Sequence, residues 1–305
     1  MKERSRLIIA GIILTTLVLS LTSSYAADKK FEKNFSVSLG GTLNLTTDVG
    51  MVVIIGTSSG EVRVLAEIKG RDRDVKKFEV SADQAGKDVN VTGRGPGAKW
   101  WFWGSSDLDV RFSIQVPREY NLNVRTSGGD IDVRSIKGGV LGKTSGGNLV
   151  VRDVEGTVKM ETSGGNILSE RVNGTVNFET SGGNVEIAST AGSVDATTSG
   201  GDIRVSDVVG EVRVETSGGN VSVKVSGGNK GIHASTSGGN IDISIPKDVG
   251  ANIDASTSGG EVICDLPVTM IGKIDESRLR GTLNGGGSTI YAHTSGGDVR
   301  IRKTE

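Results

Sequence analysis

The sequence predicts an all-β protein folded as a single-stranded parallel β-solenoid (β-helix) with coils of about 18 residues. The first observation is a repeated tetrapeptide, Thr-Ser-Gly-Gly, whose starts lie 18 residues apart at Thr126, Thr144, Thr162, Thr180, Thr198 and Thr216. The second is that apolar residues recur at every second position within each repeat, which is the period of a strand. A fixed repeat of this length is typical of a stacked architecture. The motif returns with looser spacing at Thr236, Thr257 and Thr294.

Four positions of the repeat are mostly β-branched or aliphatic: the sixth, eighth, eleventh and fifteenth, counted from the threonine. In the second repeat they are Leu149, Val151, Val154 and Val158. Such side chains suit a half-buried pleated surface, so we expect these positions to face inward. Each repeat then contains two short strands, with one turn at the Gly-Gly pair and another near the glycine at position thirteen.

Two architectures fit this pattern: a long antiparallel meander, or a stack in which each repeat is one coil. In a stack the same position recurs directly above itself, which explains identical residues at identical positions. A meander provides no geometric reason for such strict identity. We therefore favour the parallel solenoid.

The residues of the corner have individual roles in this prediction. The pair Gly128-Gly129 and its copies are expected to supply positive φ where the chain reverses. The Asn or Asp that follows, such as Asn148, is expected to tolerate left-handed backbone and to bond its own backbone. The threonines are placed at the inner edge of the corner, where their hydroxyls can form a ladder between coils.

The segment 1–26 has the features of a secretory signal peptide. Lys2, Arg4 and Arg6 precede the mostly apolar run Leu7–Leu21, and Ser24-Tyr25-Ala26 ends it with small residues at the two cleavage positions. The alternative is an uncleaved anchor helix. We favour cleavage near Ala26, because the apolar run is short for a membrane span. The protein is therefore expected in the periplasm, at the cell surface or outside the cell.

The rest of the chain is expected to form one domain, from residue 31 to residue 303. It comprises irregular N-terminal coils (31–125), regular repeats (126–264), an insertion that doubles one coil (265–290) and a last coil (291–303). Within the irregular part, Phe35–Leu39, Thr42–Leu45, Met51–Ile55 and Glu61–Val64 are predicted strands, and Arg71–Phe78 is either a short helix or a solvated excursion. An internal match joins the two parts. The segments Ser113–Val124 and Ile243–Asp254 each place a proline a few residues before an Asn-led strand and then Thr-Ser-Gly-Gly.

Composition excludes several classes of partner. The net charge of the whole chain is −1, and removal of 1–26, with its three basic residues and one acidic residue, leaves a value near −3. Because the charges are not segregated, nucleic acid and an anionic membrane surface are not expected as main partners. No motif for a small-molecule cofactor is present.

These residues together resemble a known family. Phe35, Gly40-Gly41, Leu43, Gly50, Val116-Pro117 and the Thr126-Ser-Gly-Gly-Asp130-Ile131 run with its successors are similar to the bacterial putative adhesin domain family. The resemblance covers essentially the whole chain after residue 30. It implies an exported or envelope-associated β-solenoid of unknown function, and it transfers no catalytic or ligand residue.

The candidate contact loop is the aromatic run Trp100, Trp101, Phe102 and Trp103, which contains all three tryptophans of the chain. Alternate residues of a strand face opposite sides, so these side chains cannot all enter the core. One interpretation is an exposed tip that contacts a protein, a glycan or a membrane surface. The other is a cap over the end or side of the solenoid.

Other candidate chemistry is weak. The Gly93–Lys99 segment lacks the GxxxxGK[ST] pattern of a phosphate-binding loop, and the corners mostly carry neutral Asn where calcium-binding rolls carry acids. Cys264 falls at an inward position and is expected to be a small buried hydrophobe. His233 and His293 have no matching Ser/Asp constellation in the sequence and are assigned to outward strand positions. We therefore expect no catalytic, metal or cofactor residues.

Three functions remain open. The first is a non-enzymatic exported interaction protein of the cell envelope, in which loops such as 93–104 or 265–290 make the contacts. The second is a carbohydrate-active β-helix enzyme. The third is a purely structural envelope component. We favour the first, because the chain shows no groove rich in aromatic and charged residues.

Overall fold

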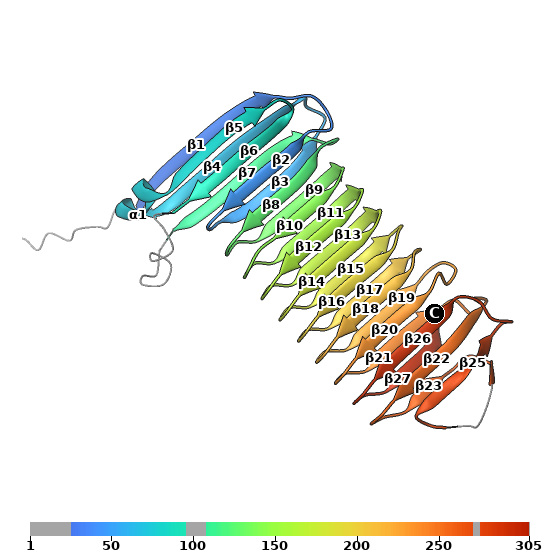
Figure 1. Cartoon of the computed structure of the whole chain (residues 1–305). Coiled ribbons are helices and arrows are strands. Elements are labelled where there is room, and N and C mark those ends of the chain that lie inside the picture. The colour runs from blue at the N-terminus through green and yellow to red at the C-terminus, as the bar shows by residue number, and fades with distance from the viewer. Residues whose placement is uncertain (1–25, 96–107, 271–274, 305) are drawn as a thin grey trace, which may run out of the picture.

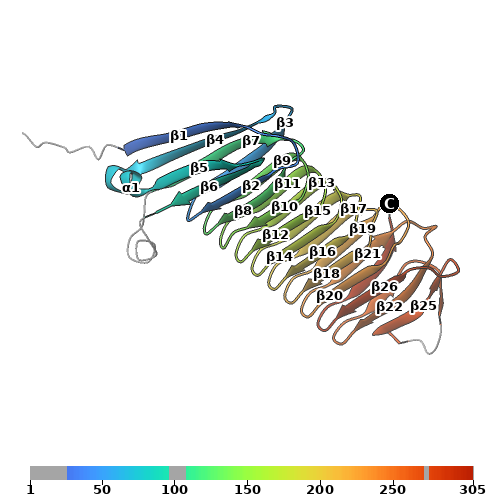
Figure 2. The same cartoon turned by 45° about the horizontal axis from the view of Figure 1, so that its top comes forward.

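A computed structural model describes residues 26–95, 108–270 and 275–304. Two long sheets lie face to face and form a rod that is one coil wide, with the N-terminal strands at one end and the C-terminal strands at the other (Figure 1). The view in Figure 2 shows the two layers along the rod. The predicted all-β parallel solenoid is confirmed. No helix among the described residues has the length and apolar character needed to span a membrane.

We call the two layers sheet A and sheet B. Across the described residues sheet A has 13 strands and sheet B has 14. In spatial order, sheet A consists of β1 (Ala26–Ser36), β4 (Glu61–Arg71), β7 (Asp109–Pro117), β3 (Met51–Thr57), β9 (Ile131–Lys137), β11 (Leu149–Glu155), β13 (Ile167–Asn173), β15 (Val185–Thr190), β17 (Ile203–Val208), β19 (Val221–Val225), β21 (Ile241–Ile245), β27 (Val299–Lys303) and β23 (Val262–Cys264).

The order of strands in sheet B starts at the C-terminal end of the rod. It consists of β24 (Val268–Met270), β25 (Arg278–Leu283), β22 (Ala251–Thr257), β26 (Thr289–Thr294), β20 (Ile232–Thr236), β18 (Val212–Thr216), β16 (Val194–Thr198), β14 (Val176–Thr180), β12 (Val158–Thr162), β10 (Val140–Lys143), β8 (Asn121–Thr126), β2 (Thr42–Thr47), β6 (Asp88–Arg94) and β5 (Glu79–Ala85). The segment Arg71–Phe78, for which the sequence allowed a short helix or a solvated excursion, contains the short helix α1 (Asp72–Lys77).

Each regular coil is one strand of sheet B, a Thr-Ser-Gly-Gly corner, one strand of sheet A and a second corner. Neighbouring coils pair in parallel with the 18-residue register of the sequence: Val158 lies opposite Val176, and Ile167 opposite Val185. Residues at the sixth, eighth, eleventh and fifteenth positions are buried, as predicted. The core also uses position seventeen, where Met160 and the fully buried Phe178 fill the space between the sheets.

The corner threonine joins consecutive coils, but through backbone rather than through other threonines. The Thr162 hydroxyl donates to the carbonyl oxygen of Gly147 in the preceding coil at 2.9 Å. The Thr162 hydroxyl oxygen in turn accepts from the backbone amide of Gly165 at 3.3 Å. Because the same pair of bonds recurs at Thr144, Thr180, Thr198 and Thr216, each buried hydroxyl is satisfied.

The Gly-Gly pair is required for a reason different from the one predicted. Neither Gly164 nor Gly165 has positive φ. Instead, a Cβ added to Gly165 would lie 1.9 Å from the carbonyl oxygen of Gly147, whereas one added to Gly164 would meet nothing closer than 3.9 Å. The second glycine of each pair is therefore required by close stacking of backbone on backbone, and the first is not.

Positive φ is found at the other corner. Residues at position ten are in the left-handed region with φ between 55° and 60°: Ser135, Asp153, Arg171, Ser189 and Asp207. Three of the position-thirteen glycines also have positive φ, such as Gly156 at 144°. A non-glycine residue rarely adopts this conformation, so the second corner is a repeated kink that turns the position-ten side chain outward.

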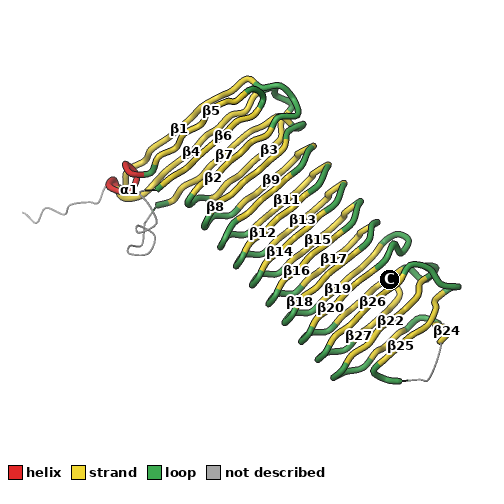
Figure 3. The backbone as a smooth tube through the Cα atoms, viewed as in Figure 1, coloured by secondary structure: helices red, strands yellow, loops and turns green. Residues whose placement is uncertain are grey.

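The corner asparagines also differ from the prediction, since they bond to the neighbouring coil rather than to their own backbone. The backbone amide of Asn166 donates to the side-chain oxygen Oδ1 of Asn148 at 2.9 Å, and the backbone amide of Asn184 donates to Oδ1 of Asn166 at 2.8 Å. These bonds form a ladder along one edge of the rod, where Figure 3 shows the turns in line. Asp serves equally well at this position because a carboxylate oxygen accepts in the same way.

The N-terminal part is less like the repeats than the sequence suggested. β1 begins at Ala26 instead of near Phe35, and β1, β4 and β5 are antiparallel to their neighbours. The edge strands β1 and β5 close this end of the core. Lys29 and Lys33 of β1 donate to the carbonyl oxygens of Phe78 and Ala82, each at 2.8 Å. These ammonium groups occupy edge carbonyls that would otherwise be open to another strand.

The order of coils departs from the order of the chain at both ends. The coil β2–β3 lies between β6–β7 and β8–β9, and the last coil, β26–β27, lies between β20–β21 and β22–β23. The chain therefore passes over a coil at two places: residues 118–120, after Pro117, pass over β2–β3, and residues 246–250, after Pro246, pass over β26–β27. These are the two segments that match each other in the sequence, and the structure explains the match as two crossovers.

The insertion 265–290 is not the doubled coil that we expected. It contributes β25, which pairs antiparallel with β22, and β24, which pairs antiparallel with β25, and the two strands cover the C-terminal end of sheet B. Its last residues form a hinge with positive φ at Asn284, Gly285 and Gly286. From this hinge the chain returns to form the coil β26–β27 inside the stack.

The corner geometry predicts opposite outcomes for neighbouring glycines. Gly165→Ala should lower the free energy of unfolding by about 2 kcal/mol or more, because its Cβ collides with a carbonyl that cannot move without disturbing the stack. Gly164→Ala, the matched control, should stay within about 0.5 kcal/mol of the parent. Urea unfolding of both variants measures the difference. Equal losses would show that close stacking does not select glycine here.

The coil order predicts that the last coil attaches everything between residues 251 and 283 to the rod. β22 and β23 pair with β26 and β27 and with no strand of the β20–β21 coil. Deletion of 288–305 should therefore remove hydrogen-exchange protection from β22 and β25, while β11–β14 keep theirs as an internal control. Full protection of β22 in the deleted protein would mean that it stacks directly on β20.

Candidate functional site

The predicted contact loop cannot be placed. Trp100, Trp101, Phe102 and Trp103 belong to 96–107, which lies outside the described residues. The loop connects β6 to β7, where other coils have their Thr-Ser-Gly-Gly corner. The alternatives of a cap and a contact tip both stay predictions.

The other residues singled out from the sequence are described. Cys264 is half-buried in β23, and burial raises the pKa of its thiol, which disfavours a reactive thiolate.

The two histidines lie on the outward face of sheet B, as predicted, and one of them has a serine partner that the sequence did not indicate. His293 Nδ1 lies 3.0 Å from the Ser256 hydroxyl. His233 stacks on Tyr291 with ring centroids 4.6 Å apart and planes 13° apart. Ser256 and His293 lie side by side on the paired strands β22 and β26.

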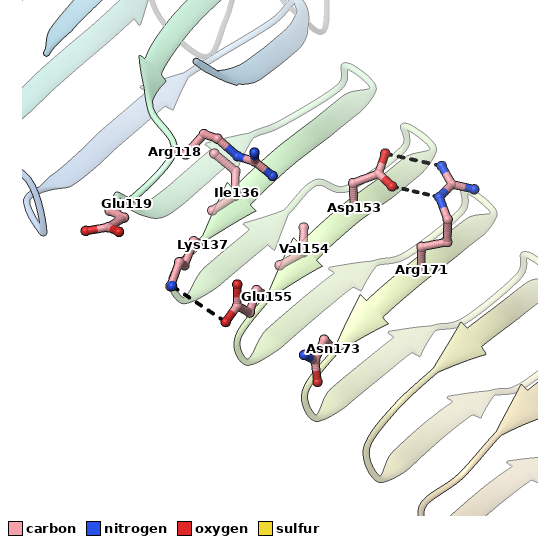
Figure 4. Close-up of a pocket in the computed structure, with 9 residues that line it drawn as sticks. All are labelled: Arg118, Glu119, Ile136, Lys137, Asp153, Val154, Glu155, Arg171 and Asn173. Carbon is pink, nitrogen blue, oxygen red and sulfur yellow. Dashed lines mark hydrogen bonds and ion pairs between the residues drawn. The ribbon is translucent and has the colours of Figure 1, made fainter. Parts of the chain in front are cut away.

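A hollow of about 450 Å³ lies along the second corner of the coils, beside the first crossover. It extends over several coils, and Figure 4 shows two rows of charged and polar side chains with apolar residues between them. One row comes from the crossover and position ten, the other from the crossover and position twelve. The lining residues are Arg118, Glu119, Ile136, Lys137, Asp153, Val154, Glu155, Arg171 and Asn173.

The kink at position ten accounts for the first row. Positive φ at Asp153 and Arg171 turns both side chains outward, and they meet in a bidentate ion pair with Nε–Oδ1 at 2.7 Å and Nη2–Oδ2 at 3.2 Å. The hydrogen bond from Arg171 lowers the pKa of Asp153, and the charge of Arg118 adds a smaller effect in the same direction. The Asp153 carboxylate is therefore ionised at neutral pH.

The second row is looser. Lys137 and Glu155 are 3.7 Å apart, and both are more than half exposed, so their ion pair contributes little to stability. Between the rows, Ile136 and Val154 turn into the core and are almost completely buried. The hollow is thus a shallow polar groove that runs across the coils.

The crossover supplies the charges at the mouth of the groove. Its backbone is fixed by bonds from the Arg118 amide to Thr57 O at 2.9 Å and from the Lys137 amide to Arg118 O at 2.7 Å. The buried Tyr120 anchors it further, with its hydroxyl donating to Lys87 O; burial raises the pKa of Tyr120 to about 12. The side chains of Arg118 and Glu119 are exposed, and among the described residues neither makes a hydrogen bond or ion pair.

This arrangement is suited to binding a polar ligand. Free charges on a rigid backbone, beside neutralised ones, can bind a polar ligand at low entropic cost. Sequence reasoning missed it because positions ten and twelve have the composition of solvent-exposed turns. The only signal was the internal match at Pro117, which marks the crossover.

Comparison with known proteins places the chain in a structural context. A model of the Toastrack DUF4097 family matches residues 41–302. A comparison with curated protein sequences gave no match.

Solved structures similar to this chain include proteins with low identity. One is described as a putative lipid binding protein from Parabacteroides distasonis ATCC 8503, at 12% identity and a TM-score of 0.45, with 90% of this chain and 97% of that chain covered. Another is a putative adhesin from Bacteroides fragilis NCTC 9343, at 14% identity and a TM-score of 0.42, with the same coverages. No function is transferred from either likeness.

The ion pair in the groove predicts an ordered series of pKa values for Asp153. In the parent protein this pKa lies below its ordinary value of 3.8 because the carboxylate accepts two bonds from Arg171. Arg171→Gln should raise it most, and Arg118→Gln should raise it less. The pair stabilises the fold above the ordinary pKa, and the contribution is lost as pH falls through the lower value. Carboxyl-carbon NMR titration measures all three; an unchanged pKa in Arg171→Gln would contradict the pairing.

Proposed function

Because the chain belongs to the Toastrack DUF4097 family, we propose that it is an exported, non-enzymatic interaction scaffold of the cell envelope. Membership confirms the resemblance to putative adhesin domains noted in the sequence. The observation that carries the proposal is the groove at the second corner, where a rigid crossover presents the free side chains of Arg118 and Glu119. The signal-like segment 1–26 supports export to the periplasm, the cell surface or the medium.

The form of the groove favours an extended polar partner. It is open, runs across several coils and has charges of both signs, so a chain of protein or glycan lying along the rod would meet a new pair of side chains at each coil. Coils in a parallel stack repeat at about 4.8 Å. Because the rod is built on continuous sheets, these side chains stay at fixed spacing when a partner binds, and little ordering is required. A deep catalytic cleft would serve such a partner less well.

The proposal is tested in intact cells of the native host. A photo-crosslinking residue at Asn173, at the far end of the groove, should form an adduct, and Arg118→Glu should abolish it by reversing the charge at the mouth. Arg204→Glu on the outward face of β17 is the matched control and should leave the adduct unchanged. In the same samples, mass spectrometry should find the mature N-terminus near residue 27 in an extracytoplasmic fraction.

Two results would contradict the proposal. An adduct that survives Arg118→Glu would exclude the groove as the contact. Recovery of the protein in the cytoplasm with residues 1–26 intact would exclude export. Cleavage of a polysaccharide by the purified protein would replace the scaffold with the carbohydrate-active alternative.

A further inference from the structure

A second surface with distinct chemistry lies at the opposite end of the rod. On the outward face of sheet B, strands β18, β20, β26, β22 and β25 carry two parallel rows of side chains. The first row is Arg213, His233, Tyr291, Asp254 and Arg280, and the second is Glu215, Ser235, His293, Ser256 and Arg278. We call this surface the His–Tyr face.

The His–Tyr face exists because the last coil is out of sequence order. Tyr291 and His293 belong to β26, which lies between β20 and β22. If the coils followed chain order, His233 would lie opposite Asp254, and its ring stack with Tyr291 would not form. The topology therefore brings both histidines of the described chain to one surface with a tyrosine between them.

The aromatic pair is rigid and partly exposed. His233 and Tyr291 stack along the axis of the rod, and each is half-buried against its neighbours. The stack restricts both side chains before any ligand arrives, so binding to their free edges costs little conformational entropy. The Tyr291 hydroxyl and His233 Nδ1 are left as hydrogen-bonding groups at the surface, whereas His233 Nε2 lies 3.6 Å from Glu215 Oε1.

Ion pairs join the charges on this face, whose three guanidinium groups outnumber its two carboxylates by one. Arg213 pairs with Glu215, and Asp254 accepts from Arg280 at 3.0 Å while Arg278 lies 3.6 Å away. Burial, and then the nearby Arg213, lowers the pKa of His233, so its ring is neutral at neutral pH and has one donor and one acceptor. The face thus presents many oriented donors and acceptors and little unbalanced charge.

From this geometry we propose that the His–Tyr face binds a neutral polyhydroxylated saccharide chain that lies across the coils. Sugar hydroxyls both donate and accept, and they match an array of phenol, imidazole, serine hydroxyl and paired ionic groups. Rings already held in place supply apolar edges for the carbon–hydrogen faces of a sugar. The flatness of the sheet suits a chain rather than a small enclosed ligand.

Other ligand classes fit this face less well. An anionic ligand would find its guanidinium partners already paired with Glu215 and Asp254. A metal ion would need a set of ligands, and no group of three or more His, Cys, Asp or Glu side chains among the described residues is arranged to hold one. A protein partner usually contacts an apolar centre. The exposed large apolar residues of the described chain, such as Leu39, Val209 and Met270, are not members of the His–Tyr face.

The experiment titrates the purified protein by calorimetry with three hexasaccharides: a neutral glucan, an N-acetylated amino-sugar oligomer and a uronic-acid oligomer. One of the two neutral oligomers should bind with a Kd of about 100 μM, a value ordinary for an open polar surface. The uronic-acid oligomer should bind at least tenfold more weakly. No measurable binding of either neutral oligomer at 10 mM would overturn the proposal, as would preference for the acidic oligomer.

Variants identify the surface. Tyr291→Ala should weaken binding at least tenfold, and Tyr291→Phe, which keeps the ring, should weaken it less. Asn177→Ala is the matched control, since Asn177 has the same outward position in β14 and should leave the Kd unchanged. His233→Asn is a second test should Tyr291→Ala fail to fold, as judged by its melting temperature, and it should also weaken binding at least tenfold.

Wild-type affinity in Tyr291→Ala, or in His233→Asn where that variant replaces it, would overturn the proposal. A second result would also overturn it: the chain binds no saccharide, while a photo-crosslinking residue at Ser235 forms an adduct with a partner protein that is lost in Tyr291→Ala. The groove near Arg118 lies on other coils, so its crosslinking result and the result for the His–Tyr face succeed or fail independently.

Discussion

The rest of the structure depends on how closely the corners stack. At every regular coil the second glycine lies against the carbonyl of its counterpart, and a single added carbon would lie about 2 Å from that oxygen. The threonine hydroxyl uses the same carbonyl as its acceptor, so one atom both excludes a side chain and satisfies a buried polar group. This shared contact sets the 18-residue register, and the inward valines and isoleucines follow from it.

A stack with such uniform corners needs a different solution at its ends. Sheets that end in bare edges invite further strands. Here both sheets finish in antiparallel strands at the N-terminal end, and sheet B does so at the C-terminal end as well. At the N-terminal end, lysines of β1 also donate to the carbonyl oxygens of Phe78, just before β5, and of Ala82 within it. Both ends place one coil out of sequence order, so that each terminal cap is held by a coil from elsewhere in the chain. Local fraying of the first or last regular repeat is thereby opposed by pairing on both sides.

The sequence was sufficient for the fold but not for the sites. Strand period and strict repetition identified Val158 and Val176 as inward residues and identified the Gly-Gly corner. They could not show that Gly165 is required by stacking rather than by φ, because the distance between coils is not a local property. Coil order at the ends depends on non-local pairing between near-identical repeats, so the partners of His293 and Tyr291 could not be predicted from the sequence. The groove was invisible for a related reason, since its residues occupy ordinary turn positions.

Both proposed binding surfaces lie at irregularities of the stack rather than within its regular repeats. Within regular coils, outward charges largely satisfy each other, as where Glu161 lies between Lys143 at 2.7 Å and Lys159 at 2.9 Å, and its pKa falls to about 2. Such ladders are stable but have little left to offer a ligand. Where the chain passes over a coil, Arg118 and Glu119 arrive without a matching rung and stay free. Where the last coil enters the stack, Tyr291 comes to lie beside His233. A repeat protein can therefore acquire binding surfaces without changing its core, by changing the order in which its coils are stacked.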